Sequence, residues 1–272
     1  MKRRRSIIFC AASGLAASLT GIGLAGYSDP VWSQIINLND AINKAGRQRM
    51  LSQRMAKGYL ALGLDVSPAI ADKSLTASMA LFDRQLIELK VFAPAPDIKT
   101  TYQQLESKWS DYKGALVGTK PSQQGAASVL SLGNEVLALA NQGTLQLEKT
   151  SSKPVGKLVN IAGRQRMLSQ RMASHYLAAS WNVQAQNSKS EMLKAQTEYS
   201  QAHQVLSKAP ENTERIAQEL LLAEQQFVFF QAALQKLQLG RTDKLLMTDV
   251  FQTSERILQV MDNITNLYSQ IS

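Results

Sequence analysis

The chain has 272 residues and a formal net charge of +9, with 44% hydrophobic, 6% aromatic and 19% charged residues. This length suffices for one large domain or for two of about 120 residues. The scarcity of aromatic residues favours amphipathic helices over sheets. The only cysteine is Cys10, so a chain that has lost its N-terminal segment cannot form disulfides, thiolate metal sites or a cysteine nucleophile.

The first segment has the layout of an export signal. Four basic residues, Lys2 to Arg5, precede a charge-free run from Ile7 to Gly26, as in a basic n-region followed by an apolar h-region. We therefore predict that residues 1–28 are a signal peptide and that the protein is periplasmic. The adjacent arginines leave twin-arginine export open beside the general secretory route. The alternative is an uncleaved anchor in the inner membrane, because about 20 apolar residues can span a bilayer.

The rest of the chain is predicted to form two sets of four helices. The first set is expected at residues 31–64, 68–93, 97–117 and 122–149, with Ser67 as the N-cap before a proline in the first turn. The second set is expected at residues 154–182, 188–209, 210–240 and 242–272. Short loops suit antiparallel neighbours. We predict an all-α fold of two tandem four-helix bundles, residues 31–150 and 152–272, packed as a pseudo-twofold pair.

The sequence AGRQRMLSQRMA occurs twice, at residues 45–56 and 162–173. In the first copy, helical spacing gives two stripes, one of Leu51, Met55, Gly58 and Leu62, the other of Ile42, Gly46, Arg49, Gln53 and Ala56. A glycine inside a helix is unfavourable by about 1 kcal/mol relative to alanine. Gly46 therefore indicates close approach of another helix, towards which Arg49 would point. The second copy presents Gly163, Arg166 and Gln170 in the same way.

If these two helices pack against each other, Arg49 and Arg166 face each other. Two guanidinium groups about 6 Å apart repel by roughly 3 kcal/mol at an effective dielectric of 20. A small anion between them would replace that repulsion with two charge-assisted contacts. The alternative is that each arginine pairs with a carboxylate of a neighbouring helix, for which Glu135 and Glu255 are plausible. The sequence leaves open whether the two boxes meet within one chain or between chains.

The boxes carry a family resemblance. The residues Ala41 to Gly46, followed by Arg49-Met50, Ser52 and Arg54, resemble the P-box of Nar-type nitrate/nitrite sensor kinases, and AGRQRMLSQRM resembles the PilJ/NarX-like sensor domain of type IV pilus chemoreceptors. The resemblance implies periplasmic four-helix bundles that bind one nitrate between two P-box helices. The ligating arginines would be Arg49 and Arg166. The supporting residues would be Gly46, Gly163, Gln53, Gln170, Arg54 and Arg171.

The sequence also departs from the nitrate-sensor pattern. Arg47 and Gln48 replace small and apolar residues of that pattern, and Gly58 of the first copy becomes His175 in the second. A site formed by the two boxes is therefore not fully symmetric. No kinase or chemotaxis module follows the second set of helices in this sequence, so we expect the bound state to be relayed to a membrane sensor kinase or chemoreceptor.

These observations lead to two functional hypotheses. The first is an exported, non-catalytic sensor that binds nitrate or nitrite and needs no cofactor. The second is a structural or adaptor bundle of an envelope, pilus or chemosensory complex. An enzyme is not expected, because the sequence has no nucleophile–base pairing and no phosphate-binding loop. Nucleic-acid binding is not expected either, because the basic excess lies in the six box arginines. The two histidines, His175 and His203, lie on different predicted helices and do not indicate a metal site.

Overall fold

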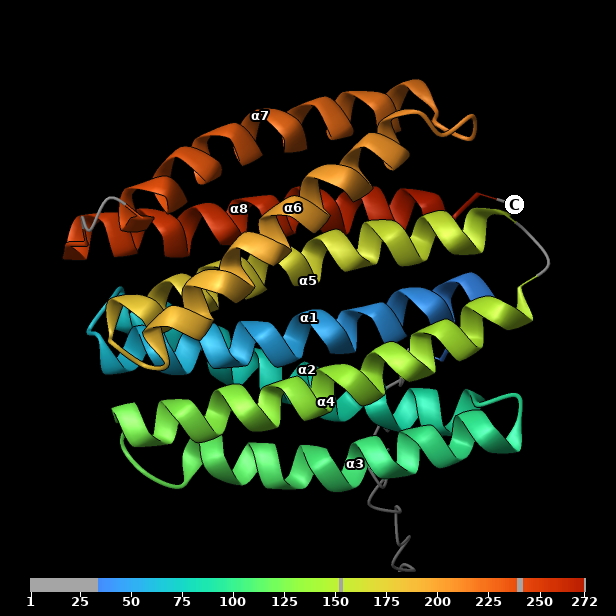
Figure 1. The fold of residues 1–272 in the computed structure, drawn as a ribbon. Coiled ribbons are helices and arrows are strands. Elements are labelled where there is room, and N and C mark those ends of the chain that lie inside the picture. Colours follow the sequence, from blue (N-terminus) through green and yellow to red (C-terminus); the bar gives the residue numbers. More distant parts are fainter. Residues whose placement is uncertain (1–33, 152–153, 239–241, 272) are drawn as a thin grey trace, which may run out of the picture. The chain divides into compact units, whose positions relative to one another are not determined.

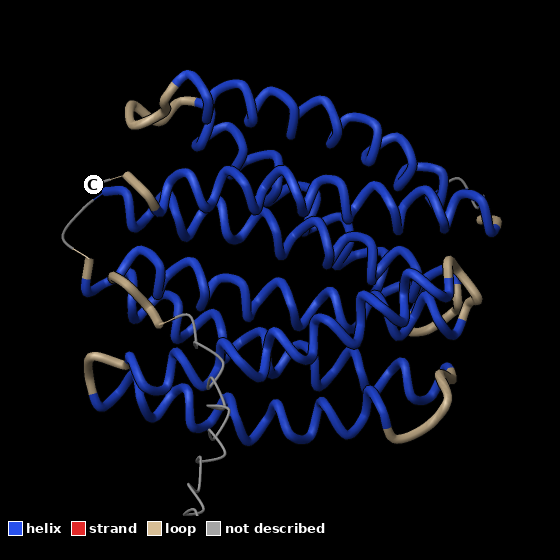
Figure 2. The backbone as a smooth tube through the Cα atoms, turned by 180° about the vertical axis from the view of Figure 1, so that it is seen from behind, coloured by secondary structure: helices blue, strands red, loops and turns tan. Residues whose placement is uncertain are grey.

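The computed structural model describes residues 34–151, 154–238 and 242–271, so the predicted signal peptide lies outside the described part. The described residues form helices and contain no strand (Figure 2). The helices are α1 (Leu38–Gly63), α2 (Pro68–Phe92), α3 (Pro96–Val117), α4 (Gln123–Thr150), α5 (Pro154–Ser180), α6 (Ala185–Ser207), α7 (Glu214–Gln238) and α8 (Lys244–Ser269). The all-α prediction is confirmed.

The helices form two up-and-down sets, α1–α4 and α5–α8, that meet through α1 and α5 (Figure 1). These two central helices lie side by side and run in the same direction, while α3 and α7 lie on the two outer sides (Figure 1). The short connection between α4 and α5 is possible because an up-and-down set of four helices begins and ends at the same end. The predicted pair of tandem bundles is therefore present.

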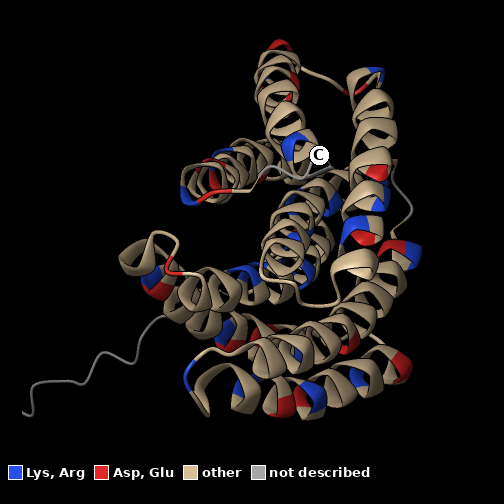
Figure 3. Cartoon of the chain, turned by 60° about the vertical axis from the view of Figure 1, so that its left-hand side comes forward, with Lys and Arg blue, Asp and Glu red and all other residues tan. Residues whose placement is uncertain are grey.

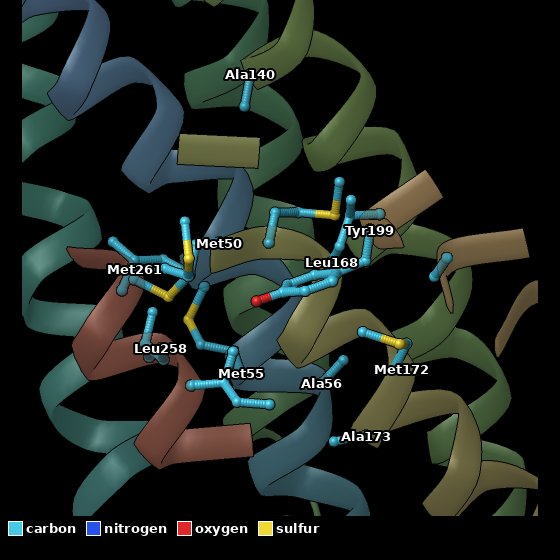
Figure 4. Close-up of a cluster of buried hydrophobic side chains, with 14 of the residues drawn as sticks. Met50, Met55, Ala56, Ala140, Leu168, Met172, Ala173, Tyr199, Leu258 and Met261 are labelled. Atoms are coloured by element: carbon cyan, nitrogen blue, oxygen red, sulfur yellow. The ribbon is translucent and has the colours of Figure 1, made fainter. Parts of the chain in front are cut away.

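The central position of α1 explains why its sequence has apolar residues on more than one face. This helix contacts α2, α4, α5 and α8. Both of its predicted stripes are therefore buried, with Leu51 and Met55 on one and Ile42 on the other, except at Leu62, which is partly exposed. Figure 4 shows Met50 and Met55 of α1 beside Leu258 and Met261 of α8, while Met172 of α5 lies on the other side of the cluster. Burying a side chain of this size contributes about 1.5–3 kcal/mol. The box methionines are thus core residues that join the two sets.

Two helix starts differ from the sequence prediction by more than three residues. Helix α1 begins at Leu38 rather than at residue 31, because the Asn37 side chain caps it by accepting a hydrogen bond from the Asp40 N–H at 2.9 Å. Helix α7 begins at Glu214 rather than at residue 210, because Pro210 lies in a turn and the Thr213 hydroxyl accepts from the Ile216 N–H at 3.2 Å.

Ser67 precedes α2 as predicted, but its side chain does not cap the helix. Ser67 has φ 45° and ψ 52°, and its side chain makes no capping hydrogen bond, although Pro68 does occupy the first turn. The left-handed backbone at this position turns the chain sharply after α1 and takes the Ser67 side chain out of capping range. No helix among the described residues combines the length and hydrophobicity needed to cross a bilayer.

Candidate functional site

The two boxes meet at a glycine crossing, which we define as the contact between Gly46 of α1 and Gly163 of α5. A Cβ placed on either glycine would lie 3.9 Å from the Cα of the other. The parallel direction of the helices is also evident at their C-terminal ends, where the Trp181 ring lies against Gly63. The missing side chains at the crossing leave room for long side chains from the next turn to reach the contact.

Arg49 and Arg166 fill that room. Their side chains lean towards the helix N-termini, as helical side chains do, so each reaches the opposite helix one turn before its glycine. Arg49 Nη2 donates to Asn160 Oδ1 at 2.7 Å and to Asn160 O at 3.2 Å, and Arg166 Nη2 donates to Asn43 O at 3.1 Å. Both Nη2 atoms lie within 3.6 Å of the point where a Cβ on Gly46 would stand. The structure thus brings the two arginines together within one chain.

Both guanidinium groups are fully buried, and their other ends have different partners. Arg166 Nη1 forms an ion pair with Asp262 of α8. Arg49 Nη1 donates instead to the neutral amide oxygen of Asn141 of α4, at 3.0 Å. Within the described ranges, no carboxylate lies within ion-pairing distance of Arg49. A buried cation without a carboxylate in contact is costly, and an anion of suitable size would reduce that cost.

The electrostatics reflect this difference. Burial, with the positive charges of Arg164 and Arg166 nearby, lowers the pKa of Arg49 to about 9. Burial also lowers the pKa of Arg166, to about 10, but the Asp262 carboxylate opposes that shift. Burial disfavours ionisation of Asp262 itself, yet the Arg166 and Arg47 charges hold its pKa at about 2. In addition, the Nε atoms of both Arg49 and Arg166 are buried without a hydrogen-bond partner among the described residues.

Of the supporting residues inferred from the resemblance, Gly46 and Gly163 form the crossing itself. The other four, Gln53, Gln170, Arg54 and Arg171, lie about two turns beyond it and contact neighbouring helices. Arg54 holds both carboxylate oxygens of Glu255, at 3.0 and 2.5 Å. Arg171 pairs with Glu191 at 2.8 Å and donates to Gln53 Oε1 at 3.1 Å. The Gln170 amide donates to a backbone carbonyl of α8. These contacts fix α1 and α5 within the bundle.

The carboxylates suggested as partners of Arg49 and Arg166 were wrong. Glu255 pairs with Arg54 and with Lys57, and Glu135 pairs with Lys108 on the outer helix α3. The reason is the register of α8, which places Asp262 rather than Glu255 beside the buried Arg166. Asp262 lies about two helical turns after Glu255 on the same helix. Only the packed structure fixes that register.

Sequence reasoning missed several polar residues at the crossing. Asn43 and Asn160 repeat at the same spacing as the boxes, so extending the repeat upstream would have found them. Asn141 and Asp262 lie where the two halves have diverged and carry no such signal. Lys57 is also buried, 2.5 Å from Glu255 and 4.4 Å from the centre of a phenylalanine ring of α8. Burial lowers the pKa of Lys57 to about 8.

The remaining charges do not form a second site of the same kind. Basic and acidic residues alternate along the helices instead of forming one broad basic face (Figure 3). Across the described residues, no group of three or more His, Cys, Asp or Glu side chains is arranged to hold a metal ion. The glycine crossing is therefore the part of the described molecule where buried positive charge is concentrated.

Comparison with known proteins supports the relationship suggested by the boxes. The family model of the N-terminal region of type IV pili methyl-accepting chemotaxis transducers, PilJ, matches residues 31–133 and 149–238. No curated protein and no solved structure matches the chain. The matched segments cover most of the chain and contain one box each, which agrees with a tandem arrangement of a chemoreceptor-type sensor domain. The chain therefore belongs to the PilJ family of chemotaxis-transducer N-terminal domains.

Proposed function

We propose that this protein is an exported, periplasmic and non-catalytic sensor that binds one small anion at the glycine crossing and relays its bound state to a membrane chemoreceptor or sensor kinase. Nitrate and nitrite are the first anions to test, because the boxes resemble the P-box of nitrate/nitrite sensors. The observation that carries this proposal is the meeting of Arg49 and Arg166, both fully buried, with their Nε atoms unpartnered among the described residues.

Physical chemistry limits the expected affinity. A very small ligand gains at most about 1.5 kcal/mol per heavy atom, or roughly 6 kcal/mol for the four heavy atoms of nitrate. This corresponds to a Kd of tens of micromolar at best. Such an affinity suits a sensor that must release its ligand when the concentration outside the cell falls.

A structural or adaptor role is the second candidate. It is favoured by the ion pairs that the other box arginines make with carboxylates of neighbouring helices, such as Arg54 with Glu255 and Arg171 with Glu191. In that case the boxes would serve only to hold the two helical sets together. Arg49 argues against it, since a purely structural arginine gains stability from a carboxylate partner and Arg49 has none within the described residues.

The test is a calorimetric titration of the purified protein with nitrate and then nitrite, alongside Arg49→Ala and Arg166→Ala. One anion bound per chain is expected. Binding should be lost in Arg49→Ala, which removes the buried guanidinium group that lacks a carboxylate partner. It should be weakened in Arg166→Ala, which removes the second buried positive charge at the crossing and leaves the Asp262 carboxylate without that partner. The matched control is Arg84→Ala, which removes an exposed arginine of α2 and should leave the affinity unchanged.

Other outcomes of this titration would change the proposal. One anion per two chains would move the site to an interface between molecules. No heat of binding from either anion, in a protein whose circular dichroism spectrum is helical, would contradict nitrate and nitrite sensing and favour the adaptor role.

A further inference from the structure

The protein contains a carboxylate that already occupies one half of the glycine crossing. Asp262 Oδ1 accepts hydrogen bonds from Arg166 Nη1 and, at 2.9 Å, from Arg47 Nη2. These two arginines belong to different boxes, so the carboxylate of Asp262 links α1, α5 and α8. In chemical terms, Asp262 is a planar, monovalent oxyanion that is tethered to the chain and held by two guanidinium groups.

The other half has the same arrangement without the anion. Asn141 Oδ1 accepts from Arg49 Nη1 at 3.0 Å and from Arg164 Nη1 at 3.3 Å. Arg164 corresponds to Arg47 in the repeat, and Arg49 corresponds to Arg166. Asn141 thus stands to Arg49 and Arg164 as Asp262 stands to Arg166 and Arg47, but with an uncharged amide in place of the carboxylate.

The compensating carboxylates in this half do not touch Arg49. Glu148 accepts a hydrogen bond from the Asn160 amide, whose oxygen binds Arg49, so its charge reaches Arg49 only through Asn160. Glu198 of α6 pairs with Arg164, and the two side chains are 38% and 37% exposed. Asp262 is nearly as exposed as Glu198, at 34%, but it contacts an arginine side chain with 0% exposure. A carboxylate partner is therefore missing at Arg49, the position where water cannot screen the charge.

A cleft leads from solvent to this position. It lies between α4, α5 and α6, has a volume of about 400 Å³, and its lining includes Asn141, Arg164, Arg171, Lys194, Glu191 and Glu198. Asn141 is partly exposed, and its amide lies between the cleft and Arg49 Nη1. Rotation of the Asn141 side chain would open Arg49 to the cleft.

We propose that the anion site is one-sided: one planar monovalent oxyanion enters this cleft and binds Arg49 and Arg164 in place of the Asn141 amide, as the tethered carboxylate of Asp262 binds Arg166 and Arg47. The inference rests on the proposed function, since it assumes that the crossing binds an anion. It specifies the ligand class by the shape and charge of Asp262. Nitrite, nitrate and formate belong to this class, whereas sulfate is tetrahedral and divalent.

Two opposite substitutions, Asn to Asp at position 141 and Asp to Asn at position 262, test the proposal. Asn141→Asp supplies the missing carboxylate, so calorimetric titration with nitrite, nitrate or formate should show at least 100-fold weaker binding than in the unmodified protein. Asp262→Asn removes the tethered carboxylate, so the number of anions bound per chain should rise from one to two. Sulfate should bind at least tenfold more weakly than nitrite to the unmodified protein.

The matched control is Asn134→Asp. Asn134 lines the same cleft, and its side chain accepts from Arg171 at 2.8 Å, so this variant adds the same charge at a place away from Arg49. Its anion affinity should stay within about threefold of the unmodified protein. A loss as large as that of Asn141→Asp would overturn the assignment of the site to Asn141, because a general change of charge would explain both results.

A second measurement uses thermal stability in place of the heat of binding. In buffer with a large organic anion only, Asn141→Asp should melt at a higher temperature than the unmodified protein, because it neutralises Arg49. Asp262→Asn should melt at a lower temperature and recover more in formate than in sulfate of equal ionic strength. If the unmodified protein and Asn141→Asp bound the same anion equally well, the one-sided site would be overturned, but the proposed anion sensor would still stand. Absence of binding to nitrite, nitrate and formate in the unmodified protein would overturn both.

Discussion

Arg49 and Arg166 are the same residue of the same repeat, but their surroundings give them different effects on stability. Both are fully buried, and both donate to an oxygen of the opposite central helix. Arg166 also has the carboxylate of Asp262, whereas Arg49 has only neutral acceptors within the described part of the chain. The identity of a residue in a motif therefore does not determine whether it stabilises the fold; its charge partner does.

Substitution of each arginine by methionine should separate the two cases. In the absence of a binding anion, Arg49→Met should change the free energy of unfolding by less than about 1 kcal/mol, because the lost hydrogen bonds are offset by removal of an unpaired buried charge. Arg166→Met should lower it by about 1–3 kcal/mol, because Asp262 then keeps only its partly exposed partner Arg47. Urea unfolding monitored by circular dichroism measures both. Equal losses in the two variants would mean that Arg49 is as well compensated as Arg166.

At the scale of helices, small residues decide how closely neighbours pack. The glycine crossing joins the two sets, and a second close contact occurs within the first set, where α4 passes over α3. A Cβ placed on Gly143 of α4 would lie 2.9–3.0 Å from the fully buried ring of Tyr102. Gly114 of α3, by contrast, has no neighbouring atom within 4 Å of its Cβ position. The two glycines share a helical conformation and differ only in what surrounds them.

Gly143→Ala and Gly114→Ala should consequently shift stability in opposite directions. The first places a methyl group against the Tyr102 ring, which should cost about 1–3 kcal/mol through overpacking. The second meets empty space, so it should stabilise the protein by up to about 1 kcal/mol through helix propensity alone. Thermal unfolding of the two variants under identical conditions checks this pair. Stabilisation by Gly143→Ala would show that α4 can move away from α3 without loss.

At the scale of the whole molecule, the sequence predicted the parts that depend on periodicity. The duplicated box, the helical spacing and the proline and glycine breaks predicted eight helices, the central place of the boxes and the approach of Gly46 to Gly163. It did not predict that Asp262 would reach Arg166 while Asn141 reached Arg49. Those two residues lie on α8 and α4, where the halves no longer resemble each other, and packing alone fixes the register of these helices. The start of α7 was missed for a related reason, since Pro210 marks a break but does not determine on which side of the turn the helix resumes.

Acid should lower the free energy of unfolding in two stages, because different groups lose or gain charge in different pH ranges. Burial, with the charge of Arg171 nearby, lowers the pKa of His175 to about 3, from its ordinary value of 6.5. Between these two values the unfolded chain binds a proton that the folded protein does not, so stability should fall as the pH drops below about 6.5. Burial opposes ionisation of Glu255, yet Lys57 and Arg54 hold its pKa at about 2.

The second stage belongs to Glu255 and Asp262, whose pKa values are about 2 in the folded protein. Because these values lie below those of the unfolded chain, about 4, the ion pairs stabilise the protein fully above pH 4 to 5, and this contribution is lost as the pH falls towards 2. Urea unfolding at pH values from 8 to 3 should show a shallow decline below pH 6.5 and a steeper one below pH 4.5. His175→Leu should reduce the shallow decline and keep the steep one. Part of the shallow decline should remain, because burial also lowers the pKa of His203. Asp262→Asn should reduce the steep decline and keep the shallow one. If His175→Leu left the curve between pH 6.5 and 4.5 unchanged, His175 would have to be protonated in the folded protein, and solvent would have to reach its ring between α5 and its neighbours.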